Sequence, residues 1–125
     1  MRLQERNMHS KNNNKIVKDD IMIKNRNWWH IRKYYKSGHG ALVVGESGQK
    51  NGYYYFLNIT KNPPVGYSYF ETEKPINQSE EKSHIRLYLQ KGKKKTFSRW
   101  VMKYELSLKD LEIVEAFLEK KKKRL

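Results

Sequence analysis

The stretch between residues 39 and 60 contains two nearly continuous apolar runs joined by a short polar segment. The runs ALVVGE (Ala41–Glu46) and YYYFLNIT (Tyr53–Thr60) have the length and the β-branched and aromatic content of buried strands. The segment between them, SGQKNG, closes on Asn-Gly, a strong short-range signal for a hairpin. An antiparallel hairpin would bring His39, just before the first run, beside Thr60 at the end of the second.

Further strands are predicted on both sides of this hairpin, because apolar and polar residues alternate there. Glycines in KSGHG turn the chain before the hairpin, and Pro63 and Pro64 break it afterwards, since proline donates no ladder hydrogen bond. The flanking strands are NWWHIRKYY (27–35), YSYFETE (67–73), HIRLYLQ (84–90) and TFSRWVMKYEL (96–106), with KGKKK (91–95) as a basic turn.

A C-terminal helix is predicted over residues 108–120. Ser107 begins SLKD, a capping-box pattern in which an acid follows the cap residue by three positions. Within the helix an apolar stripe runs along one face, formed by Leu111, Val114, Phe117 and Leu118. The basic end, KKKKR, suits the negative end of the helix dipole.

The core of this chain must be thin, because only 37% of the 125 residues are hydrophobic and nine of them are Tyr. Tyrosine needs a bonded or wetted hydroxyl, which favours a small β domain. The sequence therefore predicts a mainly β, α+β fold: a small curled antiparallel sheet or SH3-like half-barrel with a C-terminal α-helix. We expect one such domain over residues 27–125, after a flexible basic arm over residues 1–26.

Charge limits the partners of the protein. Lys and Arg number 27 against 13 Asp and Glu, and the net charge of +14 attracts polyanions. Nucleic acid is the leading expected partner, ahead of an acidic protein and an anionic membrane surface. No apolar run approaches the roughly 20 residues of a membrane span. We expect a cytoplasmic protein without membrane association.

Metal and cofactor chemistry find few candidate residues in the sequence. The absence of cysteine excludes disulfides, thiolate sites and cysteine nucleophiles. The four histidines have no metal-ligand spacing and no carboxylate cluster beside them, and no phosphate-binding glycine loop is present. We expect neither a metal site nor a cofactor.

The remaining chemistry is a metal-free set of His, Thr, Lys and Arg near the hairpin. RNA can be cut without a metal, because its own 2′-hydroxyl is the nucleophile. The protein then needs only to remove that proton, stabilise the phosphorane and protonate the leaving oxygen. Histidine titrates in the useful range, and Lys and Arg supply fixed positive charge.

The order of WWHIRKYYKSGHGALVVGES, a turn, and YYYFLNITKNPPVGYSYFE resembles the core of the PemK/MazF/Kid-like toxin endoribonucleases and the related RNA-inhibited toxins of the ToxN kind. HGALVVGE matches the buried strand of that superfamily, and LNITK matches the strand that ends in an active-site Thr or Ser. The family usually has Arg-Pro where this chain has His39-Gly40. The resemblance implies metal-independent cleavage of single-stranded RNA, a possible homodimer, and an antitoxin that is either an acidic protein or a structured RNA.

The resemblance leaves the division of labour open: His39 takes the basic role, or Lys36 and Arg32 share it. Our predicted catalytic residues are His39, Thr60 and Lys36. Predicted RNA contacts are Arg32, Lys33, Lys61, Tyr67, His84, Arg86 and Lys103. The alternative is a non-catalytic nucleic-acid-binding module or phage-type inhibitor, in which aromatic residues on a basic barrel surface stack bases and His39 and Thr60 are ordinary turn and strand residues.

Overall fold

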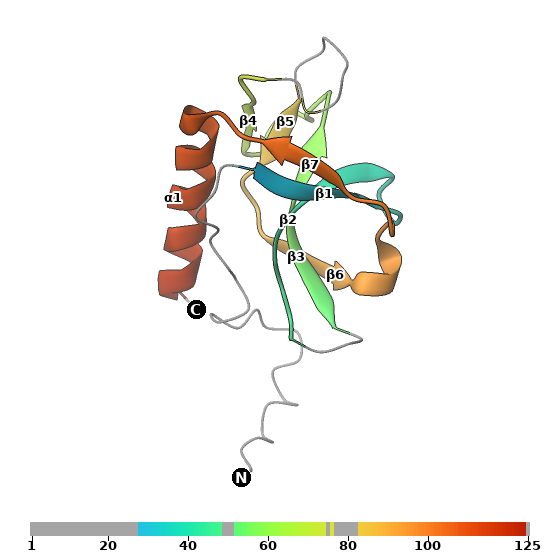
Figure 1. The fold of residues 1–125 in the computed structure, drawn as a ribbon. Helices are drawn as coiled ribbons and strands as arrows, with labels where there is room; N and C mark the ends of the chain where they lie inside the picture. Colours follow the sequence, from blue (N-terminus) through green and yellow to red (C-terminus); the bar gives the residue numbers. More distant parts are fainter. Residues whose placement is uncertain (1–27, 49–51, 75, 77–82, 125) are drawn as a thin grey trace.

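The computed structural model describes residues 28–48, 52–74, 76 and 83–124 (Figure 1). The predicted N-terminal arm, residues 1–26, lies outside this part of the chain. The elements are β1 (Trp28–Tyr34), β2 (His39–Glu46), β3 (Tyr53–Thr60), β4 (Tyr69–Glu71), β5 (His84–Arg86), β6 (Gln90–Lys93), a 3₁₀ turn η3 (Lys94–Thr96), β7 (Met102–Glu105) and α1 (Leu108–Arg124).

The strands form one antiparallel sheet with the order β4-β5-β3-β2-β1-β7, and β6 pairs with β3 off this path. The two ends of β3 have different neighbours: Ile59 and Thr60 pair with β5, whereas Tyr53–Phe56 pair with β6. The sheet is curled and does not close, and α1 lies along one side of it (Figure 1). The predicted fold class, a mainly β curled sheet with a C-terminal helix, is confirmed.

A β-bulge in β2 contributes to the curl. Val43 is opposite Phe56, but Gly45 is opposite Tyr55, so that Val44 is an extra residue in its strand. Bulges bend a strand and increase its twist. The Val44 side chain is fully buried in the main core, which anchors the bend.

The main core lies between α1 and one face of the sheet. Leu42 and Leu57 are opposite each other on β2 and β3 and fully buried, and Val114 and Leu118 of α1 are fully buried in the same cluster. Successive residues of a strand point to opposite faces. Ala41 and Phe56 therefore belong to a second cluster with Phe97, against which Tyr34 and Tyr54 pack.

Three predicted strands are shorter than expected. Of residues 67–73 only Tyr69–Glu71 form a strand. The predicted strand 84–90 is a strand only over His84–Arg86: the Leu87 N–H still donates to the Ser68 carbonyl beside β4, but Leu89 then turns into the main core. The chain then pairs with the other end of β3 as β6, over part of the predicted basic turn. In the predicted strand 96–106 only Met102–Glu105 form a strand, and Phe97 makes an isolated antiparallel bridge with Tyr34.

The predicted cap of α1 is present in a modified form. The Asp110 N–H donates to Ser107 Oγ at 3.1 Å, as a capping box requires. The buried Asp110 carboxylate, however, accepts the Glu73 N–H at 2.8 Å, which attaches the helix to the segment after β4. Nearby, Tyr104 donates its hydroxyl to the Lys74 carbonyl at 2.8 Å, and burial raises the pKa of Tyr104 to about 12.

No helix in the described part of the chain is long and apolar enough to cross a membrane.

Replacing Asp110 by Ala should lower the free energy of unfolding by about 1–3 kcal/mol, because the Glu73 N–H loses its acceptor and the helix loses its link to β4. Urea unfolding measures this loss. Lys109→Ala, at the exposed neighbouring position, is the control and should change stability by less than about 0.5 kcal/mol. Equal losses in the two variants would contradict the structural role of the carboxylate.

Candidate functional site

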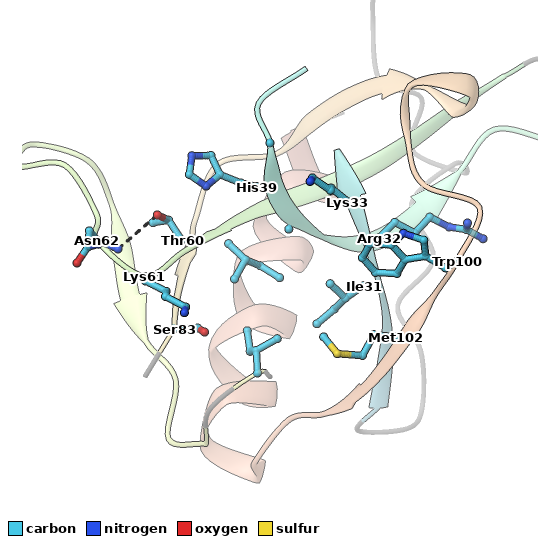
Figure 2. A pocket seen from close by; sticks show the side chains of 14 residues that line it. Ile31, Arg32, Lys33, His39, Thr60, Lys61, Asn62, Ser83, Trp100 and Met102 are labelled. Carbon is cyan, nitrogen blue, oxygen red and sulfur yellow. Dashed lines mark hydrogen bonds between the residues drawn. The ribbon is translucent and has the colours of Figure 1, made fainter. Parts of the chain in front are cut away.

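Strand pairing places His39 and Thr60 in one cleft. The outermost pair of β2 and β3 is Gly40 opposite Ile59, so His39 and Thr60 are the next residues outward on the two strands. Both line an open cleft of about 620 Å³ (Figure 2). The sequence suggested that His39 lies just before the strand. In the structure His39 is the first residue of β2.

The floor of the cleft is apolar. Ile31, Ile59 and Ile76 line the cleft and are each buried, and Met102 of β7 lines it beside Ile31 (Ile31 and Met102 are labelled in Figure 2). A Cβ atom on Gly40 would lie 3.6 Å from Ile59 Cβ and 3.7 Å from Ile31 Cγ2. Gly40 has no side chain to cover Ile31 and Ile59, so these two side chains remain at the surface of the cleft.

The rim of the cleft is cationic. Lys33 is opposite Gly40 in the β1–β2 pair and lines the cleft. Figure 2 shows Lys33, His39, Thr60 and Lys61 among the side chains that line the cleft. The described residues that line this cleft include no carboxylate.

The hydrogen bonds around the two residues leave their chemistry accessible. Thr60 Oγ1 accepts the Asn62 N–H at 3.4 Å, a long contact, and its own proton remains a donor. His39 is exposed, and within the described part of the chain no hydrogen bond engages its imidazole. An anion that entered the cleft would meet the Thr60 hydroxyl proton and the exposed His39 imidazole without a competing hydrogen bond among the described residues.

A tight turn determines where His39 emerges. The N–H groups of Ser37 and Gly38 both donate to the Tyr34 carbonyl, and Gly38 has a φ of +75°. Ser37 Oγ then accepts the His39 N–H at 3.2 Å. This left-handed position is one that glycine adopts without steric cost.

The other predicted site residues separate into those at the cleft and those elsewhere. Arg32, Lys33 and Lys61 line the cleft. Lys36 is exposed in the β1–β2 turn, and Lys103 is exposed opposite His30 on β7; neither is among the lining residues.

The remaining predicted contacts lie beyond Thr60. His84 is opposite Thr60 in the β3–β5 pair, with its Nε2 3.9 Å from Glu71 Oε1. Its buried Nδ1 has no hydrogen-bond partner among the described residues. Arg86 stacks on the exposed rings of Tyr67 and Tyr88, with 4.5 Å from its Cζ to each ring centroid. These aromatic and cationic residues form a separate surface.

Sequence reasoning missed Trp100, which lies at the rim of the cleft with 56% of its surface exposed (Figure 2). The signal was the alternation of aromatic and basic residues, which SRWVMKY shares with NWWHIRKYY. The predicted strand over 96–106 concealed it, because in the structure this segment meets β1 only at an isolated bridge between Phe97 and Tyr34, and Trp100 lies between that bridge and β7. Met102 and Ile76 were missed because only contacts between residues distant in the chain bring them to this floor.

No protein family model, no curated protein and no solved structure matches this chain. The described residues also contain no group of three or more His, Asp or Glu side chains that could hold a metal ion.

Gly38→Ala should lower the free energy of unfolding by about 1–2 kcal/mol, because a Cβ is disfavoured in the left-handed region. Nothing lies within 4 Å of the added Cβ, so backbone strain alone is measured. Gly48→Ala is the matched control: it has equal open space and no positive φ. A Gly38 variant as stable as the Gly48 variant would show that this turn does not constrain His39.

Proposed function

We propose that the protein is a metal-independent endoribonuclease that cleaves single-stranded RNA through attack of the RNA's own 2′-hydroxyl. One observation carries the proposal: His39 and Thr60 share a cleft with Lys33 and Lys61, above an apolar floor. A general base, a hydroxyl donor and fixed positive charge are the groups that this reaction requires.

In the proposed reaction neutral His39 removes the proton of the 2′-hydroxyl, and the 2′-oxygen forms a bond to the adjacent phosphorus. The bond between phosphorus and the 5′-oxygen then breaks, leaving a 2′,3′-cyclic phosphate and a 5′-hydroxyl end. The Lys33 or Lys61 ammonium supplies the proton that the leaving oxygen needs. Thr60 donates a hydrogen bond to a non-bridging oxygen, which gains charge in the phosphorane.

The shape and charge of the cleft support RNA as the substrate class. A floor of Ile and Met side chains suits the flat face of a base or a ribose, while the cationic rim suits the phosphate. The net charge of +14 increases the rate of encounter with any polyanion. DNA lacks the 2′-hydroxyl and would bind without being cut.

The biological setting that we propose rests on the motif resemblance alone. As in the PemK/MazF/Kid-like toxins, the ribonuclease would be one half of a toxin–antitoxin system. Its antitoxin would be an acidic protein or a structured RNA, and either one would cover the same cationic cleft.

A non-catalytic binding module is the second candidate, and Trp100 favours it. An exposed indole beside Arg99 and Arg32 is a platform on which any unpaired base stacks. Such a protein would retain single-stranded RNA intact and would not need His39 or Thr60.

The test incubates purified protein with mixed single-stranded RNA in chelator and sequences the fragment ends. His39→Ala should reduce cleavage about 10²- to 10⁴-fold, as expected for loss of a general base. Thr60→Val should reduce it about 10²-fold, because a donor to the developing charge is lost, while Thr60→Ser should retain most activity.

Lys109→Ala provides the control, since that side chain is exposed outside the cleft and its loss should leave cleavage nearly unchanged. RNA binding by the variants is measured in parallel. Binding without cleavage by the unaltered protein would reject the nuclease and identify the binding module.

A further inference from the structure

A second cleft of about 670 Å³ lies next to the first, and Arg32 lines both. The second cleft is formed by the end of β6, the turn η3 and the segment that follows it. Its cationic lining consists of Arg32, Lys93, Lys94, Lys95 and Arg99, and the described residues that line it include no carboxylate, although Glu46 pairs with Lys94 at its edge. No predicted catalytic residue lies in it.

Two of these cations form a fixed frame around Tyr54. Arg32 Nη1 donates to the Ser98 carbonyl at 2.8 Å, and its Cζ lies 5.0 Å from the Tyr54 ring centroid. Lys94 Nζ lies 2.7 Å from Glu46 Oε2, donates to the Ser47 carbonyl at 3.3 Å and is 5.4 Å from the same ring. These contacts hold both side chains in place.

The other cations of the cleft are available for a ligand. Lys93, Lys95 and Arg99 are exposed, and within the described part of the chain no hydrogen bond or ion pair engages their side chains. Their mutual repulsion is tolerated in water and is relieved when an anion with several charges binds. The frame beneath them fixes the spacing that this anion has to match.

We infer that the second cleft binds the phosphate backbone of the RNA strand whose scissile phosphate occupies the first cleft. This inference rests on the proposed function. Arg99 lines the second cleft, and the next residue, Trp100, lines the first. An RNA strand that occupies both clefts therefore passes over these two residues. In this arrangement Trp100 stacks on a base of that RNA. Phosphate contacts carry no sequence information, so the second cleft adds affinity for longer strands without selecting a sequence.

A nucleic-acid strand suits this surface better than an acidic protein segment. A folded or helical partner would need apolar contacts, and the aromatic rings here do not supply them. Phe97 is buried in the second cluster, and Tyr54 is covered by Arg32 and Lys94. What the cleft presents is charge and N–H donors, which phosphate oxygens accept.

The experiment measures binding of 2′-O-methyl oligouridines, which lack the nucleophile and stay intact. A 3-mer has only two internucleotide phosphates and cannot fill both clefts, whereas a 12-mer has eleven and is long enough to occupy both. The test variant carries Lys93→Gln, Lys95→Gln and Arg99→Gln. The control carries Lys74→Gln, Lys109→Gln and Lys120→Gln, which removes the same charge from exposed positions outside both clefts. Urea unfolding verifies that both triple variants are folded.

We expect the test variant to bind the 12-mer about tenfold more weakly at 0.15 M salt, with a slope of log K against log salt smaller by about 2. Its affinity for the 3-mer should stay unchanged. The control should retain most of its 12-mer affinity, because its lost charges are distant from the strand.

Equal 12-mer affinity in the test and control variants would overturn the inference. If cleavage still depended on His39 in that case, the proposed function would remain supported. If the unaltered protein cuts no RNA but the test variant still loses 12-mer affinity, the nuclease fails and the second cleft stands. Polyglutamate that binds as tightly as the 12-mer, and is weakened equally by the test variant, would also overturn the inference in favour of an acidic protein partner.

Discussion

Antiparallel pairing between β2 and β3 holds the two most apolar strands together and determines where the other parts of the molecule lie. With Leu42 opposite Leu57, both side chains are buried beneath α1. The same register ends with Gly40 opposite Ile59, which forms the floor of the first cleft. A slip by one residue would turn the leucines away from the core and separate His39 from Thr60. The core and the candidate site therefore depend on one set of backbone hydrogen bonds.

The cations at the two clefts are of two kinds: some are held by contacts within the protein, and others are exposed. Arg32 and Lys94 are held by carbonyl groups, by Glu46 and by the Tyr54 ring, and so they belong to the framework of the fold. Lys33, Lys93, Lys95 and Arg99 project from that framework at the clefts. At physiological ionic strength charges are screened over about 8 Å, so exposed cations can gather without unfolding the sheet. A polyanion gains most where a rigid frame keeps such cations from moving apart.

Much of the fold follows from local patterns. The two apolar runs, the Asn-Gly signal and the Ser107 cap each act over a few residues, and the strands and helix that they predicted are present. The exceptions are residues 87–89 and 97–101. β3 pairs with β5 at one end and with β6 at the other, so the chain must leave one partner before it meets the next. Alternation within a single segment contains no information about such a change of partner.

The sequence by itself determined the two strands of the central hairpin, which face of α1 is apolar, and that His39 and Thr60 lie at adjacent strand ends, because a hairpin is a local structure. Only the tertiary structure decided which cations accompany them. Lys33 faces the cleft and Lys36 does not, because the tight turn at Gly38 ends the alternation of β1. Trp100, Met102 and Arg99 reach the clefts through contacts between residues distant in the chain. Those contacts form only after the sheet has curled, so they cannot be predicted from any short segment of the sequence.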